Sequence, residues 1–283
     1  MLISQIGLLL VTGGFAGILG SILGIGGGII LTPFLTLVMG LEIKYAIAAS
    51  IVCVIATSSG ATIAYLKDDM LNLRVAMFLE IATTIGAIVG AILSGIVPTG
   101  FLFLLFGGFL LFSVINMIQK LRGKSEALSN EVIGDPLAKK LKLNGSYYDK
   151  VLEKQIDYQV EKVPGGFAMM FGAGIASGLL GIGSGVFKVT AMDTIMKIPL
   201  KPSSATSNLM MGVTAAASAM VYFFNGTILP EIAAPLALGV LIGATIGSRI
   251  MQRLSSFVIR LIFVPILLFM GIQMILRGFG VII

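Results

Sequence analysis

Four long stretches without any Asp, Glu, Lys or Arg constrain the fold of this chain more than any other feature. They run over residues 45–66, 100–119, 203–224 and 232–248. Each is close to the roughly 20 apolar residues with which a helix crosses about 30 Å of hydrocarbon. Charged residues make up only 11% of the chain and the mean hydropathy is +1.05, whereas about a quarter of the residues of a soluble domain are charged. The sequence therefore predicts an all-α polytopic membrane protein.

The chain repeats itself at a shift of 157 residues, the separation of Gly24 and Gly181. Without a gap, this shift aligns two glycine clusters, at residues 24–28 and 181–185, and a series of identical residues after them. The identical pairs include Lys44 with Lys201, Ser50 with Ser207, Thr57 with Thr214, Tyr65 with Tyr222, Gly86 with Gly243 and Gly90 with Gly247. Chance similarity between apolar segments does not keep one register across loops, so we interpret the chain as a duplicated bundle.

Each half contains the same order of segments. An apolar stretch leads into the glycine cluster, a segment of half-bilayer length follows, and three full-length segments complete the half. The segments are residues 5–22, 29–39, 43–66, 73–97 and 101–120, and then 165–180, 186–196, 200–224, 231–250 and 257–276. We expect the first two segments of each half to form one bent or re-entrant unit, which gives four helices per half. The predicted parts are one membrane repeat over residues 1–120, a linker over 121–163 and a second repeat over 164–283.

The placement of Lys and Arg predicts an orientation for the two halves. If the linker is cytoplasmic, the loops that contain Lys67, Arg74, Lys197 and Arg249 also lie inside, as the positive-inside tendency requires. Both termini are then extracytoplasmic, and the two halves are inverted relative to each other, as in many secondary transporters. The net charge of +6 is thus attributed to loops beside a lipid bilayer in the cell membrane, and no nucleic-acid partner is expected.

The linker is the one region with the composition of a soluble segment. Asn144-Gly145 and the alternating patterns at residues 147–151 and 156–160 predict a small β-hairpin. The linker is either a simple connection, or tie, between the two halves or a regulatory element. The tie is favoured, because no site chemistry is visible in this segment.

The two glycine clusters are the first candidate substrate site. A glycine-rich break that opens a helix leaves backbone N–H groups unsatisfied at the positive end of the helix dipole, which favours an anion. The candidate residues are Gly24, Gly26, Gly27, Gly28, Gly181, Gly183, Ser184 and Gly185. Close helix packing is the alternative, and it is the preferred interpretation for Gly13, Gly14, Gly17, Gly86, Gly90, Gly243 and Gly247.

Polar residues on the full-length segments form a second group of candidates. Ser50 and Thr57 are seven residues apart and therefore share a helical face, and Ser207 and Thr214 repeat this spacing. With Asn208 they offer hydroxyl and amide donors to an oxyanion. Hydrogen bonds between helices, or to the backbone of the same helix, are the alternative.

Charged residues inside membrane segments are costly and usually functional, and three of those in the predicted segments are candidates for the site. Lys188 and Asp193 lie in the short segment of the second half, and their counterparts Leu31 and Thr36 are uncharged. A Lys188 that faces a cavity would supply the positive charge of an anion site. A pair with Asp193, or a lysine that reaches the membrane surface, is the alternative. Glu80 and Asp193 are the candidates for proton coupling.

The sequence predicts neither catalysis nor a cofactor. There is no histidine, and the single cysteine, Cys53, lies inside an apolar run, so no imidazole relay, disulfide or metal site is expected. No Gly-Lys-Ser/Thr follows the glycine clusters, which argues against a phosphate-binding Walker loop. An enzyme is the weakest interpretation, because no arrangement of nucleophile and base is visible. The sequence predicts no particular oligomeric state.

Taken together, these motifs resemble the TauE/SafE (sulfite exporter) family. The similarity rests on the glycine break, on its copy over residues 181–189, and on Ala205-Thr206-Ser207-Asn208 followed by Gly212-Val213-Thr214-Ala215. It covers essentially the whole chain, including a Tyr147-Tyr148-Asp149 linker seen in some members. The resemblance implies an eight-helix secondary transporter whose first helix in each half is V-shaped. It also implies an anion such as sulfite, thiosulfate or a sulfonate, usually moved with protons. Thr190 departs from the family pattern, which has a proline there, and this implies a softer bend.

The leading hypothesis is a secondary transporter that exports a small anion by alternating access around a site at the membrane midplane. An anion channel, with the glycine breaks as its selectivity filter, is the alternative. The residues leave open which anion is moved, in which direction, and with which coupling ion.

Overall fold

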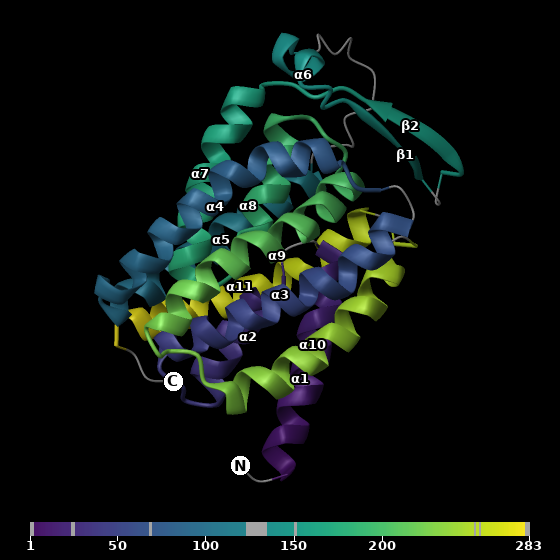
Figure 1. The fold of residues 1–283 in the computed structure, drawn as a ribbon. Helices are drawn as coiled ribbons and strands as arrows, with labels where there is room; N and C mark the ends of the chain where they lie inside the picture. Colours follow the sequence, from purple (N-terminus) through teal and green to yellow (C-terminus); the bar gives the residue numbers. More distant parts are fainter. Residues whose placement is uncertain are drawn as a thin grey trace.

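Two series of helices in the same order, with a small hairpin element between them, make up the fold (Figure 1). A computed structural model describes residues 3–23, 26–67, 70–122, 135–149, 152–251, 253–254 and 256–280. The first half contains α1 (Ile3–Leu23), α2 (Gly28–Pro33), the π-helical turn η1 (Phe34–Val38), α3 (Ile43–Lys67), α4 (Leu73–Ile96) and α5 (Thr99–Arg122). The linker contains α6 (Pro136–Lys140), β1 (Gly145–Asp149) and β2 (Lys154–Tyr158). The second half contains α7 (Val163–Leu180), α8 (Gly185–Thr190), η2 (Ala191–Ile195), α9 (Leu200–Phe224), α10 (Pro230–Met251) and α11 (Ser256–Gly278).

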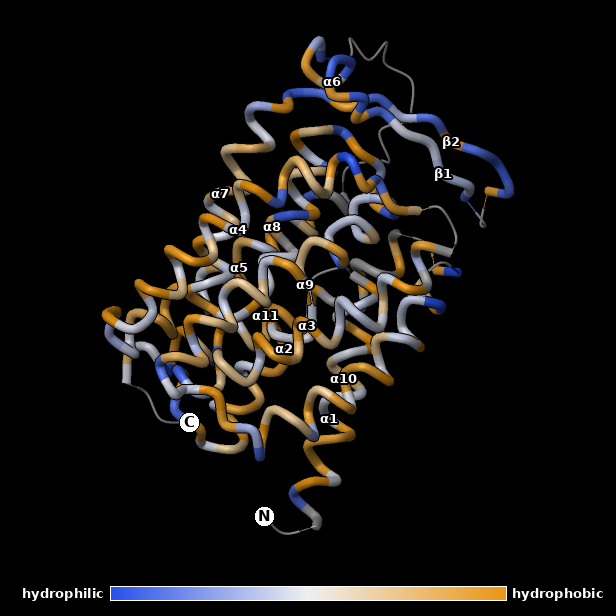
Figure 2. Tube along the Cα trace, viewed as in Figure 1, coloured by the Kyte–Doolittle hydropathy of each residue, from blue (hydrophilic) through white to orange (hydrophobic). Residues whose placement is uncertain are grey.

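The long helices have the length and surface of membrane spans. Within the described residues, seven helices are long and apolar enough to cross a membrane, and residues 28–38 and 264–278 form two shorter apolar helices. Large apolar side chains are exposed on the outside of the bundle, such as Ile81 and Ile85 on α4 and Phe223 on α9. Hydrocarbon solvates such a surface and water does not. Figure 2 shows hydrophobic residues along the helices and many of the hydrophilic ones on α6, β1 and β2. The prediction of an all-α polytopic membrane protein is confirmed.

The first helix of each half is interrupted at its glycine cluster. In the second half, Gly181 and Gly183 separate α7 from α8 and have φ angles of +68° and +67°. In the first half, Gly26 has a φ of +75° between α1 and α2, while Gly24 lies outside the described residues. Glycine adopts these left-handed angles without the steric penalty that a Cβ imposes. The break that the sequence predicts is therefore made by the backbone freedom of these glycines.

The two interrupted helices follow the same course on both sides of the break. Before it, the Tyr65 hydroxyl donates a hydrogen bond to the Ser21 carbonyl (2.9 Å), and the equivalent Tyr222 donates to the Gly178 carbonyl (2.6 Å). After it, the short helices change from α to π geometry at equivalent positions, at the ends of α2 and α8. The second half has Thr190 there instead of proline, and the position of the transition is the same. A proline is therefore not required for this change in helical geometry.

The two halves pack through exchanged partners. Helix α1 packs along α10 of the other half, α7 packs along α4, α3 and α9 contact each other, and α5 pairs with α11. Glycines permit the close approach, because an added Cβ would overlap the partner backbone. This holds for Gly13, Gly17, Gly86, Gly90, Gly243 and Gly247, so the predicted packing role is confirmed for them. A Cβ on Gly14 would make only an ordinary contact, 3.7 Å from the Gly239 carbonyl oxygen.

The linker carries the hairpin that its sequence predicts. Strands β1 and β2 are antiparallel, with Tyr147 opposite Ile156 and Asp149 opposite Lys154. Tyr147, Asp149, Ile156 and Tyr158 are buried, whereas Tyr148, Gln155 and Asp157 are exposed. Figure 1 shows this element at one end of the bundle, while α1 begins and α11 ends toward the opposite end.

We expect Gly243→Ala to destabilise the protein and Gly95→Ala to leave its stability almost unchanged. A methyl group at residue 243 would overlap the Gly14 carbonyl oxygen on α1, whereas one at residue 95 would have no atom within 4 Å. Overpacking of this kind costs about 1–3 kcal/mol. The apparent melting temperature in detergent should therefore fall for Gly243→Ala alone. Equal melting temperatures for the two variants would contradict the close packing of α1 against α10.

Candidate functional site

The two glycine breaks contact each other inside the bundle. A Cβ on Gly28 would overlap the carbonyl oxygen of Gly181. Added Cβ atoms on Gly26 and on Gly183 would each lie 3.2 Å from the Met211 sulfur and 3.3 Å from a methyl group of Val54. Both breaks therefore face the same two side chains, which come from α3 and α9 and are fully buried. These two side chains are equivalent in the repeat, and they fill the space between the breaks in this conformation.

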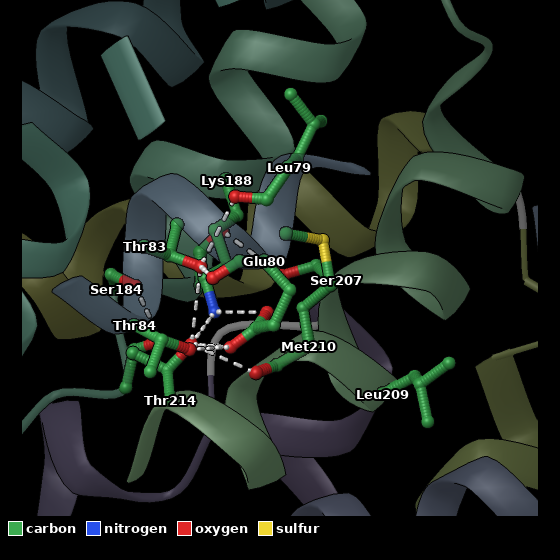
Figure 3. Close-up of polar contacts among 12 residues, drawn as sticks. Leu79, Glu80, Thr83, Thr84, Ser184, Lys188, Ser207, Leu209, Met210 and Thr214 are labelled. Carbon is green, nitrogen blue, oxygen red and sulfur yellow. Dashed lines mark hydrogen bonds and ion pairs between the residues drawn. The ribbon is translucent and has the colours of Figure 1, made fainter. Parts of the chain in front are cut away.

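Beside the second break, a lysine, a glutamate and a threonine form a buried polar cluster (Figure 3). The ammonium of Lys188, on α8, lies 3.7 Å from Glu80 Oε2 on α4, with side-chain exposures of 0% and 13%. The Lys188 ammonium also donates to Thr214 Oγ1 on α9 (2.5 Å), and Thr214 Oγ1 lies 2.5 Å from Glu80 Oε1. Three helices thus contribute one polar side chain each. The alternative in which Lys188 extends to the membrane surface is wrong, since the side chain is completely buried.

The two carboxylate oxygens of Glu80 have different partners. Glu80 Oε1 accepts from Thr214 and from Thr84 (3.0 Å), whereas Oε2 has no hydrogen-bond partner and faces the ammonium as an ion pair. In a low-dielectric interior, each buried charge requires its partner. The ammonium is therefore neutralised by Glu80 in this structure.

The charged cluster, to which both halves contribute, has no counterpart at the positions that the repeat relates to it. The repeat places Leu31 at the position of Lys188 and Ala237 at the position of Glu80, and only Thr57 retains the polar character of its counterpart Thr214. Leu31 is fully buried in the apolar core. The backbone is repeated, but only one of the two sites that the repeat relates carries charged side chains.

The hydroxyls of the first half lie at its own break. Gly27 N donates to Thr57 Oγ1 (3.4 Å), and the Thr57 hydroxyl donates to the Cys53 carbonyl (2.9 Å). Ser50 accepts a hydrogen bond from Thr32 of α2 (2.8 Å). Both residues therefore connect α3 to the interrupted helix. Their role in binding an anion stays a prediction.

The predicted residues at the start of α9 contact both interrupted helices. Ser207 Oγ donates to the Gly185 carbonyl (3.4 Å), at the start of α8. Asn208 Nδ2 donates to the carbonyls of Ser21 (3.2 Å) and Ser204 (3.1 Å), while its Oδ1 is buried without a hydrogen-bond partner. In this conformation the Asn208 amide therefore binds the end of α1. For Asn208 to donate to an anion, these hydrogen bonds would have to break.

Two further predicted residues lie on the same segment as Lys188. The Ser184 hydroxyl donates to the Gly183 carbonyl (2.7 Å), and Ser184 has a φ of +54°, so it occupies a conformation that favours glycine. Asp193 is half-buried on η2. The carboxylate paired with Lys188 is that of Glu80, so the predicted alternative of a Lys188–Asp193 pair does not describe this cluster.

Sequence reasoning did not find Thr83 and Thr84. Both follow Glu80 on α4 by about one helical turn. Thr84 donates to the Glu80 carboxylate, and Thr83 Oγ1 lies 3.5 Å from Thr214 Oγ1. The available signal was two adjacent threonines one turn after a glutamate inside an apolar helix. Such a signal is weak, because hydroxyls in apolar helices commonly bond to their own backbone.

The chain is similar to known proteins over most of its length. Residues 9–274 match the family described as sulfite exporter TauE/SafE. The chain belongs to this family. Among its relatives, the "Probable membrane transporter protein YunE" of Bacillus subtilis is 26% identical, with 96% of this chain and 97% of the relative covered. A "Probable membrane transporter protein" of Methanocaldococcus jannaschii is also 26% identical, with 95% of both chains covered. One of Xylella fastidiosa is 27% identical, with 88% and 87% covered.

No solved structure matches this chain. The family and the names of the relatives identify a membrane transporter of the TauE/SafE type, which agrees with the transporter hypothesis. Within this TauE/SafE protein, the buried cluster of Lys188, Glu80 and Thr214 is the candidate site with the most distinctive chemistry.

We expect Lys188→Met to destabilise this TauE/SafE protein, and the added substitution Glu80→Gln to restore stability. The single variant leaves the Glu80 carboxylate buried without its counter-charge, which costs about 3–5 kcal/mol, whereas a neutral glutamine removes that penalty. The measurement is the apparent melting temperature of the two variants and of the parent in the same detergent. If the double variant were no more stable than Lys188→Met, the two side chains would not form a coupled pair.

Proposed function

We propose that this protein is a secondary transporter that exports a small anion of the sulfite, thiosulfate or organosulfonate class in a proton-coupled cycle. The observation that carries the proposal is the buried ion pair of Lys188 and Glu80 beside two contacting helix breaks. A fixed cation at membrane depth is costly and usually serves a substrate or an ion. The family description as a sulfite exporter supports both the direction and the class of anion.

The ion pair supplies a mechanism for coupling. In this conformation Glu80 neutralises the Lys188 ammonium, which also donates a hydrogen bond to the Thr214 hydroxyl. An anion that replaces Glu80 as the partner of Lys188 leaves a second negative charge nearby. Two negative charges around one ammonium are unfavourable in a low-dielectric cavity, so Glu80 takes up a proton as the anion binds. Release of the anion restores the ion pair and returns the proton.

The remaining predicted residues would complete the anion site. The N-terminal ends of the short helices, at residues 26–28 and 183–185, supply backbone donors and partial positive charge. Ser50, Thr57, Ser207 and Thr214 add hydroxyl donors from α3 and α9. Access requires Val54 and Met211 to separate, because both now contact the two breaks. Alternating access then moves the anion past this pair from one side of the membrane to the other.

The membrane orientation in this proposal follows the inverted-repeat interpretation. The exchanged packing of α1 with α10 and of α7 with α4 supports two equivalent halves of opposite orientation. The basic loops support a cytoplasmic linker with both termini outside. Asp193 remains a second candidate for proton coupling in this cycle.

The Glu80→Gln variant, alone and combined with Lys188→Met, tests the anion site. Purified parent and variants are screened with sulfite, thiosulfate, a sulfonate, phosphate and a carboxylate, because a bound ligand raises the melting temperature by mass action. We expect Glu80→Gln to bind the preferred anion, and the double variant to bind it at least about tenfold more weakly, a loss of about 1.4 kcal/mol. Lys44→Met is the control, since it also removes a lysine but one that lies outside the cluster and donates to the Gly95 carbonyl.

Unchanged affinity in the double variant would remove Lys188 from the site, and a preference for phosphate or a carboxylate would contradict the substrate class. Flux into proteoliposomes separates the two modes of transport. Saturation with concentration and countertransport identify a carrier. Flux that rises in proportion to concentration, without countertransport, identifies the anion channel instead.

A further inference from the structure

The linker is attached to the transport bundle by a second buried ion pair. The Lys201 ammonium, in the first turn of α9, lies 2.8 Å from Asp149 Oδ1 at the end of β1, and the two side chains are only 8% and 7% exposed. Asp149 is held in place by the Leu152 amide (3.2 Å) and by the Tyr147 hydroxyl (3.4 Å). Burial and the Asp149 carboxylate raise the pKa of the Tyr147 phenol, which therefore remains protonated and available as a donor.

A second connection joins the linker to the beginning of α4. Asn72 caps this helix by accepting a hydrogen bond from Val75 N (3.1 Å). Its Nδ2 donates to the Leu143 carbonyl (2.7 Å) and to the Tyr158 hydroxyl (3.1 Å) of the linker. Its backbone N–H donates to Thr206 Oγ1 on α9 (3.1 Å). Asn72 thus connects α4, α9 and the linker through its hydrogen bonds.

The apolar contacts of the linker continue to the candidate site. Linker side chains such as Tyr147 and Ile156 share one buried cluster with Leu79 of α4 and Met210 of α9. Leu79 directly precedes Glu80, and the Met210 carbonyl oxygen lies 2.9 Å from Thr214 Oγ1. The two helices that the linker joins therefore both contribute to the charged cluster.

The beginning of α9 is buried more deeply than the end of a membrane helix usually is. Every residue from Lys201 to Asn208 is buried. Lys201 and Ser207 are six residues apart, about 9 Å along the helix axis. This buried segment therefore extends from the Lys201 pair at the linker to the second break, where Ser207 contacts Gly185.

We propose that the linker, through its described residues 135–149 and 152–160, is a latch that keeps the transporter closed on the face that bears it. Opening toward this face breaks the Asp149–Lys201 pair and separates the beginnings of α4 and α9. This inference goes beyond the proposed function: it requires a transporter with two conformations but no particular substrate. Its test reports on access rather than on transport, so it does not depend on the identity of the anion.

The test measures the reaction of a buried cysteine with a membrane-impermeant maleimide. The reporter is Ala205→Cys in a Cys53→Ala background, in nanodiscs that leave both faces accessible, because Ala205 lies on α9 about one turn after Lys201 and is fully buried. We expect Asp149→Asn and Lys201→Met to accelerate labelling at least about tenfold, since an open state normally populated at a few per cent would become the main one. The reversed pair, Asp149→Lys with Lys201→Asp, should restore slow labelling.

Lys44→Met is again the matched control, since Lys44 is the equivalent lysine of the first half and donates to the Gly95 carbonyl rather than to the linker. Gel filtration and melting temperature establish that each variant is folded. Unchanged labelling in folded Asp149→Asn and Lys201→Met would overturn the latch, as would equal acceleration by Lys44→Met. Loss of folding in both single variants would assign the ion pair to stability alone and would also overturn it.

Discussion

A lysine ammonium buried between helices is the constraint on which the rest of this structure depends. Lys188 is fully buried, and a charge in such an environment requires a counter-charge and hydrogen bonds. Glu80 and Thr214 meet that requirement only because α4 and α9 pack beside the short helix that carries the lysine. The short helix in turn exists because glycines with left-handed backbone angles interrupt the preceding span. The ion pair therefore depends on the helix break and on the exchanged packing of the two halves.

Much of the fold could be predicted because it follows from local patterns. Apolar runs specify the spans, glycines specify the breaks, and the repeat confirms each element by its copy. The partner of Lys188 could not be predicted in this way. Asp193 is five residues away in sequence, whereas Glu80 belongs to the other half and reaches the lysine only through the packing of α4 against α7 and α9. The repeat gave no guidance, because the equivalent positions hold Leu31 and Ala237. The same reason applies to Asn208, whose contact with the end of α1 depends on how the halves meet.

The two features that the repeat does not duplicate, the Lys188–Glu80 pair and the linker, lie on one group of helices. Lys188 and Glu80 lie on α8 and α4, and the linker, which occurs once, is fastened to the beginnings of α4 and α9. Helix α9 thus extends from the Lys201 pair at the linker to Thr214 at the cluster. A movement that separates α4 from α9 at the linker is transmitted to Glu80 and Thr214, because each helix behaves as a rigid element. The linker thus contacts α4 and α9, the two helices that contribute Glu80 and Thr214 to the charged site.

The central claim is that a substrate anion replaces Glu80 as the partner of Lys188, and proton uptake on binding tests it most directly. Titration calorimetry of the purified protein with its preferred anion, in buffers of different ionisation enthalpy, yields the number of protons taken up for each anion bound. For the parent protein the account predicts uptake of about one proton per anion, because binding and protonation of Glu80 are linked. It predicts that Glu80→Gln binds the anion without uptake. Anion binding by the parent without any proton uptake, or the same uptake in Glu80→Gln, would contradict it.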